Sequence, residues 1–334
     1  MNTDTIHIAY TSSRMYISFV TISIHSILES NPDTRFHFHV LGEGLTDVDV
    51  NNIKSILPAG RTELSVYPLT NLRGMLTIDV PKEFPMIAYA RLFLQSVLPE
   101  YVDRVIYMDG DTVVRGDLMP FYQSEIGEAL VGGIIDPLIS TAYKQRTGIP
   151  ADEPYINAGV LLIPLSRWRR EDLQGRFLSI LQKNNGTIYM FDQGLVNIGC
   201  RGRKCLLSPK YDMMTNYLTY SYRYLKRYNN PFYSKDIVDE AVKNPVLIHF
   251  TGRLYGRPWE VDCIHPYKEL YLHHKAATAY RDNPIQPCSV KGVDKIGVKL
   301  YRKMPFLFYS IFMRALFFVT NFKHSYIKKD NTQI

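Results

Sequence analysis

The sequence predicts an α/β fold in which a mostly parallel sheet is flanked by helices. Short apolar runs of strand length alternate with helix-length amphipathic runs through the first half of the 334-residue chain. Such alternation is typical of parallel strands joined by crossover helices that cover both faces of the sheet. The chain is 46% hydrophobic and 21% charged, an ordinary globular composition that fits one large domain or two smaller ones.

The predicted elements follow in order along the chain. In the first half, strands are predicted at 5–10, 36–41, 63–67 and 104–108, and helices at 17–30, 47–57 and 89–98. After Gly116 the alternation is less regular, with strands predicted at 130–135, 159–164 and 246–250 and helices at 166–182 and 192–198. The segment 213–235 is rich in Tyr and Arg and is interpreted as a surface loop or lid.

Residues 104–111, RVIYMDGD, form the most informative motif. A strand-like apolar run ends in two carboxylates, Asp109 and Asp111, which Gly110 separates. Side chains two apart in an extended segment point the same way, and a glycine would let the backbone turn sharply and a bulky ligand approach. Such a pair suits a Mg²⁺ or Mn²⁺ ion that bridges protein carboxylates to substrate phosphates. Two solvated aspartates that cap a strand would give the same pattern.

The motif lies where an α/β sheet usually binds its ligand. Ligands of such sheets bind beyond the carboxyl ends of the strands, and the two aspartates follow one of these ends. A second candidate is His249, which ends the strand-like run VLIHF and precedes TGRLYGRPW, a segment whose arginines offer anion-binding groups. A histidine at a strand end is usually structural, but beside a carboxylate pair its neutral imidazole becomes a candidate third metal ligand.

Other polar positions have simpler interpretations when each is taken alone. Arg91, in AYARL, would form a buried ion pair, and INAG at 156–159 and FDQG at 191–194 are polar breaks that usually mark turns or helix caps. The four cysteines form no C-x-x-C pair and no dense framework, so reduced thiols in a cytoplasmic setting are expected. No secretory signal is expected, because the first residues lack a basic region followed by a long apolar run.

The net charge of +7 is carried by the C-terminal tail. Residues 289–334 account for all of it, and the preceding 288 residues are neutral overall. A nucleic-acid binder would spread such an excess over a folded face, so no nucleic-acid partner is expected. Basic residues interleaved with aromatic ones predict that the tail contacts an anionic membrane surface. The alternative is a C-terminal helix packed on the protein.

The apolar stretch 304–322 in this tail is long enough to suggest a transmembrane helix. Arg314 in its middle and Pro305 at its start argue against one, because a central charge is costly in hydrocarbon. A boundary is expected near Asn283 and Pro284, which would separate a domain at 1–283 from the basic, aromatic tail at 284–334.

Taken in order, the motifs resemble those of glycosyltransferase family 8. The order is Y-A-R-L, an apolar strand with D-x-D, N-A-G-V-L-L-I, D-Q, and H-F-x-G with a basic residue before P-W, and it spans about Ile6 to Cys263. The resemblance implies a GT-A (Rossmann-like) fold and retaining transfer of a hexose, galactose or glucose, from a UDP-sugar to a glycan acceptor. Members that act on lipopolysaccharide are the most similar in style, which implies a lipid-linked acceptor at the inner face of a membrane.

The resemblance also implies a role for each motif. Asp109, Asp111 and His249 would bind Mn²⁺ (or Mg²⁺), which would hold the diphosphate of the UDP-hexose donor and act as a Lewis acid. Further donor contacts are expected at Arg91, Gly110, Asn157, Ala158, Gly252 and Arg257. The positions expected to take part in catalysis are Asp192 and Gln193 at the reacting face of the sugar and Asp136 near the acceptor.

Two segments depart from the family pattern. The family usually has a segment like A-T-D-D-N-Y after its first strand, whereas residues 11–16 of this chain read TSSRMY, which keeps Tyr16 and lacks the acidic pair. Contact with the nucleoside would then fall to Thr11 or Ser12. The segment between Gly252 and Pro258 is longer than usual, and Arg257 stands where the family commonly has a lysine.

The reaction route stays open at this point, and so do three functions besides retaining transfer. Retention could proceed by double displacement, with Asp192 or the weaker amide of Gln193 as nucleophile, or by same-face attack assisted by the departing phosphate, which we prefer. DGDTV also resembles the nucleophile motif of haloacid-dehalogenase-like phosphohydrolases, although that motif normally lies near the start of its domain. A catalytically silent sugar-nucleotide-binding protein and an inverting transferase with Asp136 as general base would fit the motifs as well.

Overall fold

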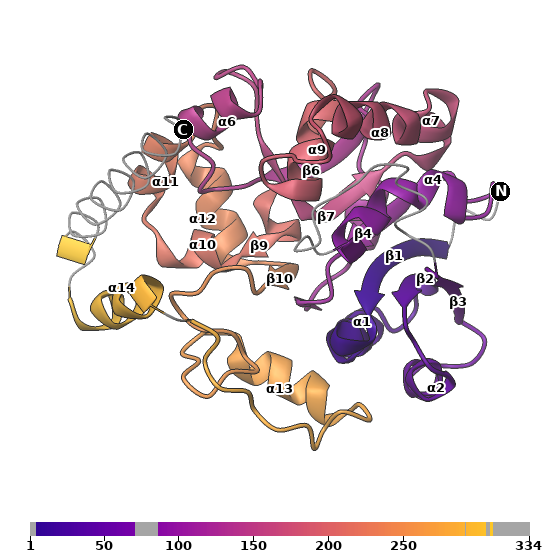
Figure 1. The fold of residues 1–334 in the computed structure, drawn as a ribbon. Coiled ribbons are helices and arrows are strands. Elements are labelled where there is room, and N and C mark those ends of the chain that lie inside the picture. Colours follow the sequence, from indigo (N-terminus) through magenta and orange to yellow (C-terminus); the bar gives the residue numbers. More distant parts are fainter. Residues whose placement is uncertain (1–4, 71–85, 291, 305–307, 310–334) are drawn as a thin grey trace, which may run out of the picture. The chain divides into compact units, whose positions relative to one another are not determined.

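The structure is a computed structural model that describes residues 5–70, 86–290, 292–304 and 308–309 (Figure 1). The chain divides into two compact units. The first comprises residues 1–251 and 269–283, and the second comprises 252–268 and 284–334. Each unit is described by itself.

A seven-stranded sheet forms the centre of the first unit among the described residues, in the order β3-β2-β1-β4-β7-β6-β8. Its parallel half consists of β1 (Thr5–Ser13), β2 (Arg35–Glu43), β3 (Thr62–Pro68) and β4 (Val105–Met108). The other half consists of β7 (Ile156–Ile163), antiparallel to β4 and to β6 (Val131–Ile135), and of β8 (Lys204–Leu206), parallel to β6. The predicted mixed, mostly parallel α/β sheet is therefore confirmed.

A second, three-stranded sheet meets the first at the acidic motif. Its central strand β10 (Leu247–His249) runs antiparallel to β5 (Thr112–Val114) and parallel to β9 (Met213–Met214). The chain leaves the large sheet at the end of β4 and enters the small one at the start of β5, so the bend between them joins the two sheets. The register pairs His249 with Thr112, which brings the histidine beside that bend.

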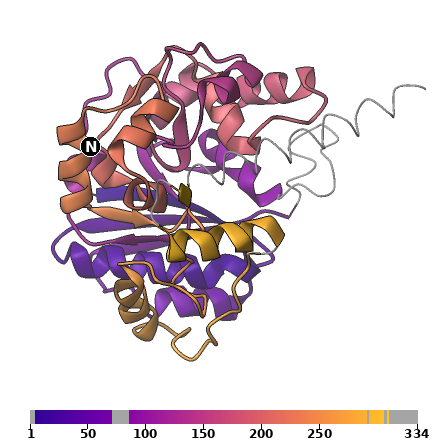
Figure 2. The ribbon, with the colours of Figure 1, turned by 90° about the vertical axis from the view of Figure 1, so that its left-hand side faces the viewer.

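Helices cover both faces of the large sheet (Figure 2). On one face lies α1 (Ile17–Ser30), whose Ser23 hydroxyl is 2.9 Å from the Tyr10 hydroxyl of β1. The other face carries a large apolar core that includes Ala9, Tyr107 and Leu161 from the strands. The helices that contribute to this core are the 3₁₀-helix η2 (Met86–Phe93), α4 (Leu94–Val97), α7 (Leu165–Arg170), α8 (Leu173–Lys183) and α9 (Phe191–Gly199).

The remaining helices of the first unit are short. They are η1 (Arg14–Tyr16), α2 (Asp47–Lys54), α5 (Met119–Tyr122), α6 (Thr141–Arg146), η3 (Pro209–Tyr211), α10 (Thr215–Thr219), α11 (Tyr222–Tyr228), α12 (Lys235–Lys243) and α13 (Lys268–Ala276). Helix α2 begins with a complete capping box, in which the side chains of Thr46 and Asp49 each bond the other residue's backbone N–H.

Three predictions about local structure are corrected. The helix predicted at 89–98 is a 3₁₀ segment followed by one α-turn. The helix predicted at 166–182 is two helices, because Asp172 adopts a left-handed conformation (φ 45°) and its side chain caps α8. The interpretation of 213–235 as a surface loop is wrong for most of its length, since α10 and α11 occupy it and Tyr217 is buried.

The second unit places the first helix of the tail against residues 252–268. Val298 of α14 (Gly292–Lys303) is buried, and Arg302 donates to the carbonyl of Asp262 at 2.7 Å. For α14, the structure therefore favours the packed-helix alternative, while most of 304–322 and all of 310–334 lie outside the described residues. No described helix has the length and apolar character needed to cross a membrane.

Candidate active site

The acidic bend and the end of β10 bring together three side chains that could hold a metal ion. Asp109 and Asp111 lie in the bend, and Nε2 of His249 is 3.2 Å from Oδ1 of Asp111. One ligand atom from each of the three residues lies within 4.8 Å of the other two. The expected convergence is therefore observed, but an extended strand is not its cause. It results from the bend together with the pairing of β10 against β5, where the N–H of Phe250 donates to the Asp111 carbonyl at 3.0 Å.

Gly159 of β7 leaves room for the side chains of His249 and Asp109. A Cβ atom at this position would overlap Cε1 of His249 and lie 2.8 Å from Oδ2 of Asp109. Its backbone carbonyl also accepts a hydrogen bond of 2.7 Å from the N–H of Asp109, which fixes the bend against β7. Sequence reasoning noted the INAG motif but did not assign Gly159 a role, although its glycine was the available signal.

Gly110 does not form the sharp turn that was expected, and it has a close neighbour that the sequence did not indicate. Its φ is not in the left-handed region, so no sharp glycine-specific turn is required here. A Cβ atom would lie 3.0 Å from Cγ2 and 3.2 Å from the backbone nitrogen of Val20 in α1. A side chain at position 110 would therefore crowd helix α1, which packs against the acidic bend.

Asp212 orients the histidine. Its Oδ1 accepts a hydrogen bond of 2.8 Å from Nδ1 of His249, which leaves Nε2 facing Asp111. Both side chains are buried. Burial disfavours the imidazolium, but the carboxylates of Asp212 and Asp111 outweigh that effect and raise the pKa of His249. Burial raises the pKa of Asp212, and His249 opposes the rise. No pattern in the sequence marked Asp212, because it precedes β9 and reaches the site only through the fold.

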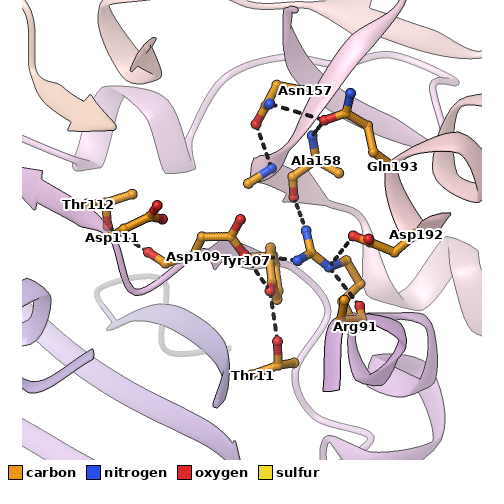
Figure 3. A network of polar contacts seen from close by, with 12 residues as sticks. Thr11, Arg91, Tyr107, Asp109, Asp111, Thr112, Asn157, Ala158, Asp192 and Gln193 are labelled. Carbon is orange, nitrogen blue, oxygen red and sulfur yellow. Dashed lines mark hydrogen bonds and ion pairs between the residues drawn. The ribbon is translucent and has the colours of Figure 1, made fainter. Parts of the chain in front are cut away.

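Arg91 connects the bend to β7 and α9 (Figure 3). Its Nη2 donates to Oδ1 of Asp109 at 2.9 Å, its Nε lies 3.0 Å from Oδ2 of Asp192, and its Nη1 donates to the carbonyl of Ala158. The guanidinium also lies over the ring of Tyr107, 4.2 Å from the centroid. Burial opposes its charge, but the two carboxylates outweigh burial and raise the pKa of Arg91.

Tyr107 and Thr11 extend this network to the end of β1. The Tyr107 hydroxyl donates to Oδ1 of Asp109 at 2.8 Å and is 2.9 Å from the Thr11 hydroxyl (Figure 3). Ser12 points to the opposite face of the strand, is 2% exposed and donates to the carbonyl of Ser13. Thr11 is thus the member of this pair that reaches the site. Tyr107 was missed, although its position two residues before Asp109 in a strand was a signal.

A chain of amide contacts runs from β7 to the end of β6. Oε1 of Gln193 accepts hydrogen bonds from Nδ2 of Asn157 at 3.1 Å and from the N–H of Ala158 at 3.2 Å. Nε2 of Gln193 donates to Oδ2 of Asp136 at 3.1 Å. Burial raises the pKa of Asp136 and that of Asp192, and Arg91 opposes the rise at Asp192. The structure therefore brings all three residues predicted for catalysis into one network with Arg91.

The other predicted positions are Tyr16 in η1 and two residues of the second unit. Tyr16 is exposed in η1 with its ring against Phe19. Arg14, which departs from the family pattern, forms an ion pair of 3.3 Å with Asp49 in α2. Gly252 and Arg257 belong to the second unit, where the Arg257 guanidinium lies over the Trp259 ring at 5.4 Å.

Carboxylates and an imidazole at the carboxyl edge of a mostly parallel sheet define a candidate metal-binding α/β enzyme. A family model described as Glycosyl transferase family 8 matches residues 7–263. The chain therefore belongs to glycosyltransferase family 8, and the resemblance found in its motifs is confirmed. Membership also decides against the phosphohydrolase alternative.

Known relatives and solved structures agree with this membership. The chain is 24% identical to a lipopolysaccharide 1,2-glucosyltransferase of Escherichia coli K12, over 80% of this chain and 76% of that protein. It is 22% identical to a lipopolysaccharide 1,3-galactosyltransferase of Salmonella typhimurium, over 82% and 78% of the two chains. A crystal structure of the galactosyltransferase LgtC, with donor and acceptor sugar analogues, matches with a TM-score of 0.67 at 22% identity, over 88% of this chain and 100% of that one. The chain shares the GT-A fold of that structure.

Proposed function

We propose that this glycosyltransferase moves a hexose, glucose or galactose, from a UDP-sugar to a glycan acceptor with retention of configuration and dependence on Mn²⁺. The observation that carries the proposal is the convergence of Asp109, Asp111 and His249 beside Gly159, where a side chain would collide with His249. The acceptor is proposed to be lipopolysaccharide or another lipid-linked glycan, since the relatives named above carry lipopolysaccharide in their names.

The ligand set at the bend fits Mn²⁺, with Mg²⁺ as the second choice. Two carboxylates suit either hard cation, while an imidazole suits Mn²⁺ better. Asp109, Asp111 and His249 would hold the ion, and Asp212 would keep the histidine in the tautomer that presents Nε2. When bound, the metal would supply Lewis-acid stabilisation of the leaving diphosphate.

Arg91 is proposed to position carboxylates rather than to bind phosphate directly. Its side chain is 7% exposed and its guanidinium already contacts Asp109, Asp192 and a backbone carbonyl, which supports a positioning role. Thr11 and Tyr16 are proposed to contact the nucleoside, with Ser12 the weaker candidate. Donor contacts at Gly110, Asn157, Ala158, Gly252 and Arg257 remain proposals.

The contacts of Asp192 and Gln193 favour same-face attack. Asp192 is paired with Arg91 at 3.0 Å, which disfavours its use as a nucleophile because attack would remove one of the two carboxylates that pair with this buried arginine. Both lone pairs of the Gln193 oxygen accept hydrogen bonds. Asp136 remains the candidate for contact with the acceptor. A covalent glycosyl-enzyme trapped at Asp192 would overturn this preference.

A screen of UDP-sugars with the purified full-length chain tests the proposal. With Mn²⁺ present, UDP should be released from UDP-glucose or UDP-galactose, and chelation should stop the release. NMR of the transferred sugar should show the anomeric configuration of the donor, whereas the opposite configuration would favour an inverting transferase. Absence of UDP release from every UDP-sugar by folded protein would favour a catalytically silent sugar-nucleotide-binding protein.

The domain at 1–283 and the tail at 284–334 are proposed to separate catalysis from membrane contact. The basic excess of the tail supports contact with the inner face of a membrane, as does the exposure of Ile296 and Phe308. Deletion of 289–334 should reduce binding to anionic liposomes and spare donor hydrolysis. If the deleted chain does not fold, the packed-helix alternative holds for the tail.

A further inference from the structure

A second cluster of metal-binding side chains lies between α1 and α13, both in the first unit. His25 and Glu29 stand one turn apart on α1, and His274 comes from α13. One ligand atom of each lies within 4.8 Å of the other two. These residues are far from the acidic bend in the sequence and have no role in the proposed transfer reaction.

The three ligand atoms form a triangle of the right size for a tetrahedral metal ion. Nδ1 of His25 is 3.1 Å from Nδ1 of His274, and Oε2 of Glu29 is 3.0 Å from His274 Nδ1 and 3.8 Å from His25 Nδ1. Zinc–ligand bonds of about 2.0–2.1 Å in a tetrahedron separate neighbouring ligand atoms by about 3.3 Å. Two of the three distances are shorter than that value, and the distance from Glu29 to His25 is longer.

Hydrogen bonding alone does not satisfy these three atoms. Nδ1 of His274 faces both His25 Nδ1 and Glu29 Oε2, yet a neutral ring nitrogen carries at most one proton. If Nδ1 of His274 donates its proton to the Glu29 carboxylate, it has neither a proton nor a lone pair left for Nδ1 of His25. If it accepts from His25, its lone pair faces a carboxylate oxygen at 3.0 Å. A cation between the three atoms satisfies all of them at once.

The neighbouring groups support a metal-binding arrangement. Nε2 of His273 lies 2.9 Å and 3.1 Å from the two oxygens of Glu29, so it holds the carboxylate in place. The His274 side chain is 3% exposed, and its Nε2 has no hydrogen-bond partner among the described residues. Every polar contact described for His274 therefore goes through Nδ1. Glu29 is 48% exposed, which gives an ion access from solvent.

We propose that His25, Glu29 and His274 form a binding site for Zn²⁺ or a similar transition-metal ion, with a fourth position open to water. Two imidazoles and one carboxylate are a ligand set that zinc commonly uses, whereas Mg²⁺ prefers oxygen ligands. The site is distinct from the one proposed for Mn²⁺ at the acidic bend, and it is independent of the proposed function.

Bound metal would tie α13 to the helix that supports the acidic bend. The hydroxyl of Ser23, in the middle of α1, is 2.9 Å from that of Thr112, which follows the bend. In α13, the ring of Tyr271 lies edge-on to Phe250, next to His249 at the end of β10. A metal ion bound between α1 and α13 would therefore restrain both helices, and each of them contacts a residue next to the acidic bend or to His249.

Zinc titration of the full-length, metal-free protein tests the site, followed by competition with a chromophoric chelator. The wild type should bind zinc, and Glu29→Gln, which keeps the shape of an exposed side chain, should bind it at least about tenfold more weakly. His274→Gln should lose the site altogether if it folds. The matched control His273→Gln removes only the contact to the carboxylate and should lose less affinity than Glu29→Gln.

Co²⁺ provides a readout that separates this site from others. Cobalt in a tetrahedral nitrogen-containing site absorbs visible light much more strongly than octahedral cobalt, so the wild type should develop this band and Glu29→Gln should not. Asp111→Ala should keep the band, because the acidic bend is a separate site. The proposal is overturned if Glu29→Gln retains wild-type zinc affinity and the cobalt band, or if the band is lost in Asp111→Ala or in His37→Asn, which disrupts the His7–His37–His39 cluster of β1 and β2.

Discussion

Among the described residues of the first unit, the acidic bend and the His25–Glu29–His274 cluster are two candidate metal sites that differ in their side chains and in the contacts that hold those side chains. At the acidic bend, two carboxylates and a buried histidine stand where two sheets meet, and further buried residues fix both Asp109 and His249. Between α1 and α13, two histidines and one half-exposed carboxylate stand on helices, with one surface histidine as support. The first site is rich in oxygen ligands and the second is rich in nitrogen ligands.

If both proposals hold, this difference indicates which metal ion each site would select and what that ion would do there. Oxygen-rich sites with open positions suit Mn²⁺ or Mg²⁺ bound together with substrate phosphates. Nitrogen-rich sites with edges near those of a tetrahedron suit zinc, and a site between two helices stabilises their packing. Removal of a ligand should therefore affect turnover at the first site and stability at the second.

The largest effect is expected for Asp111→Ala. Loss of this carboxylate would remove one of the proposed metal ligands, so the proposed Mn²⁺-dependent release of UDP should fall by about 1,000-fold, equivalent to about 4 kcal/mol. Steady-state kinetics with saturating Mn²⁺ measure the change. The melting temperature should stay close to that of the wild type, because the side chain lies in a bend and is partly exposed. A large drop in the melting temperature would instead indicate a structural role.

Gly159→Ala should have the next largest effect. The added Cβ would overlap His249 and crowd Asp109, so affinity for Mn²⁺ should fall by about 100-fold and stability by about 1–3 kcal/mol. Isothermal titration and chemical denaturation measure the two quantities. Gly116→Ala is the matched control, since its Cβ would lie 3.3 Å or more from Val246 and outside the site. Equal losses in both variants would contradict a specific role for Gly159.

Most of the fold follows from local patterns in the sequence. The helix at 17–30 and the strands before Asp109 were predicted to within a few residues. Their buried positions carry apolar residues at the spacing of a helix or strand, so the pattern is visible in the sequence. The misjudged segments have tertiary causes. Glu171 and Asp172 interrupt a continuous helical pattern through a left-handed residue, and the Tyr-rich helices α10 and α11 pack their aromatic rings in a way that composition does not reveal.

Some residues of the candidate site could likewise be predicted from the sequence, and others could not. Asp109, Asp111 and His249 follow strands and could be predicted because strand ends meet at one edge of a sheet. Asp212 comes from a segment with no motif, and its contact with His249 depends on the pairing of β9 with β10. The contact of Gly110 with Val20 could not be predicted, because the sequence does not show which helix lies behind the bend.

Substitution of Asp212 should have a smaller effect on Mn²⁺ affinity. It tests whether the orientation of His249 matters separately from the number of metal ligands. Asp212→Ala leaves the Nδ1–H of His249 buried without an acceptor, so affinity for Mn²⁺ should fall by about 10–100-fold. Asp212→Asn retains an acceptor oxygen and should recover part of this loss, because the histidine keeps its orientation. Titration of Mn²⁺ into each variant measures both changes. If the two variants bind Mn²⁺ equally weakly, the charge of Asp212 matters and the orientation of His249 does not.

Glu29→Gln should produce the smallest change in turnover and thus gives the strictest test of the comparison. The side chain is half exposed and lies on the solvent side of α1, so UDP release with Mn²⁺ should stay within about twofold of the wild type. Zinc should raise the melting temperature of the wild type and of Asp111→Ala, because an ion that binds only the folded state stabilises it, and at the same zinc concentration it should raise that of Glu29→Gln less. A turnover defect in Glu29→Gln comparable to that of Asp111→Ala would show that the two sites are coupled through α1, and the division between catalytic and stabilising metals would then fail.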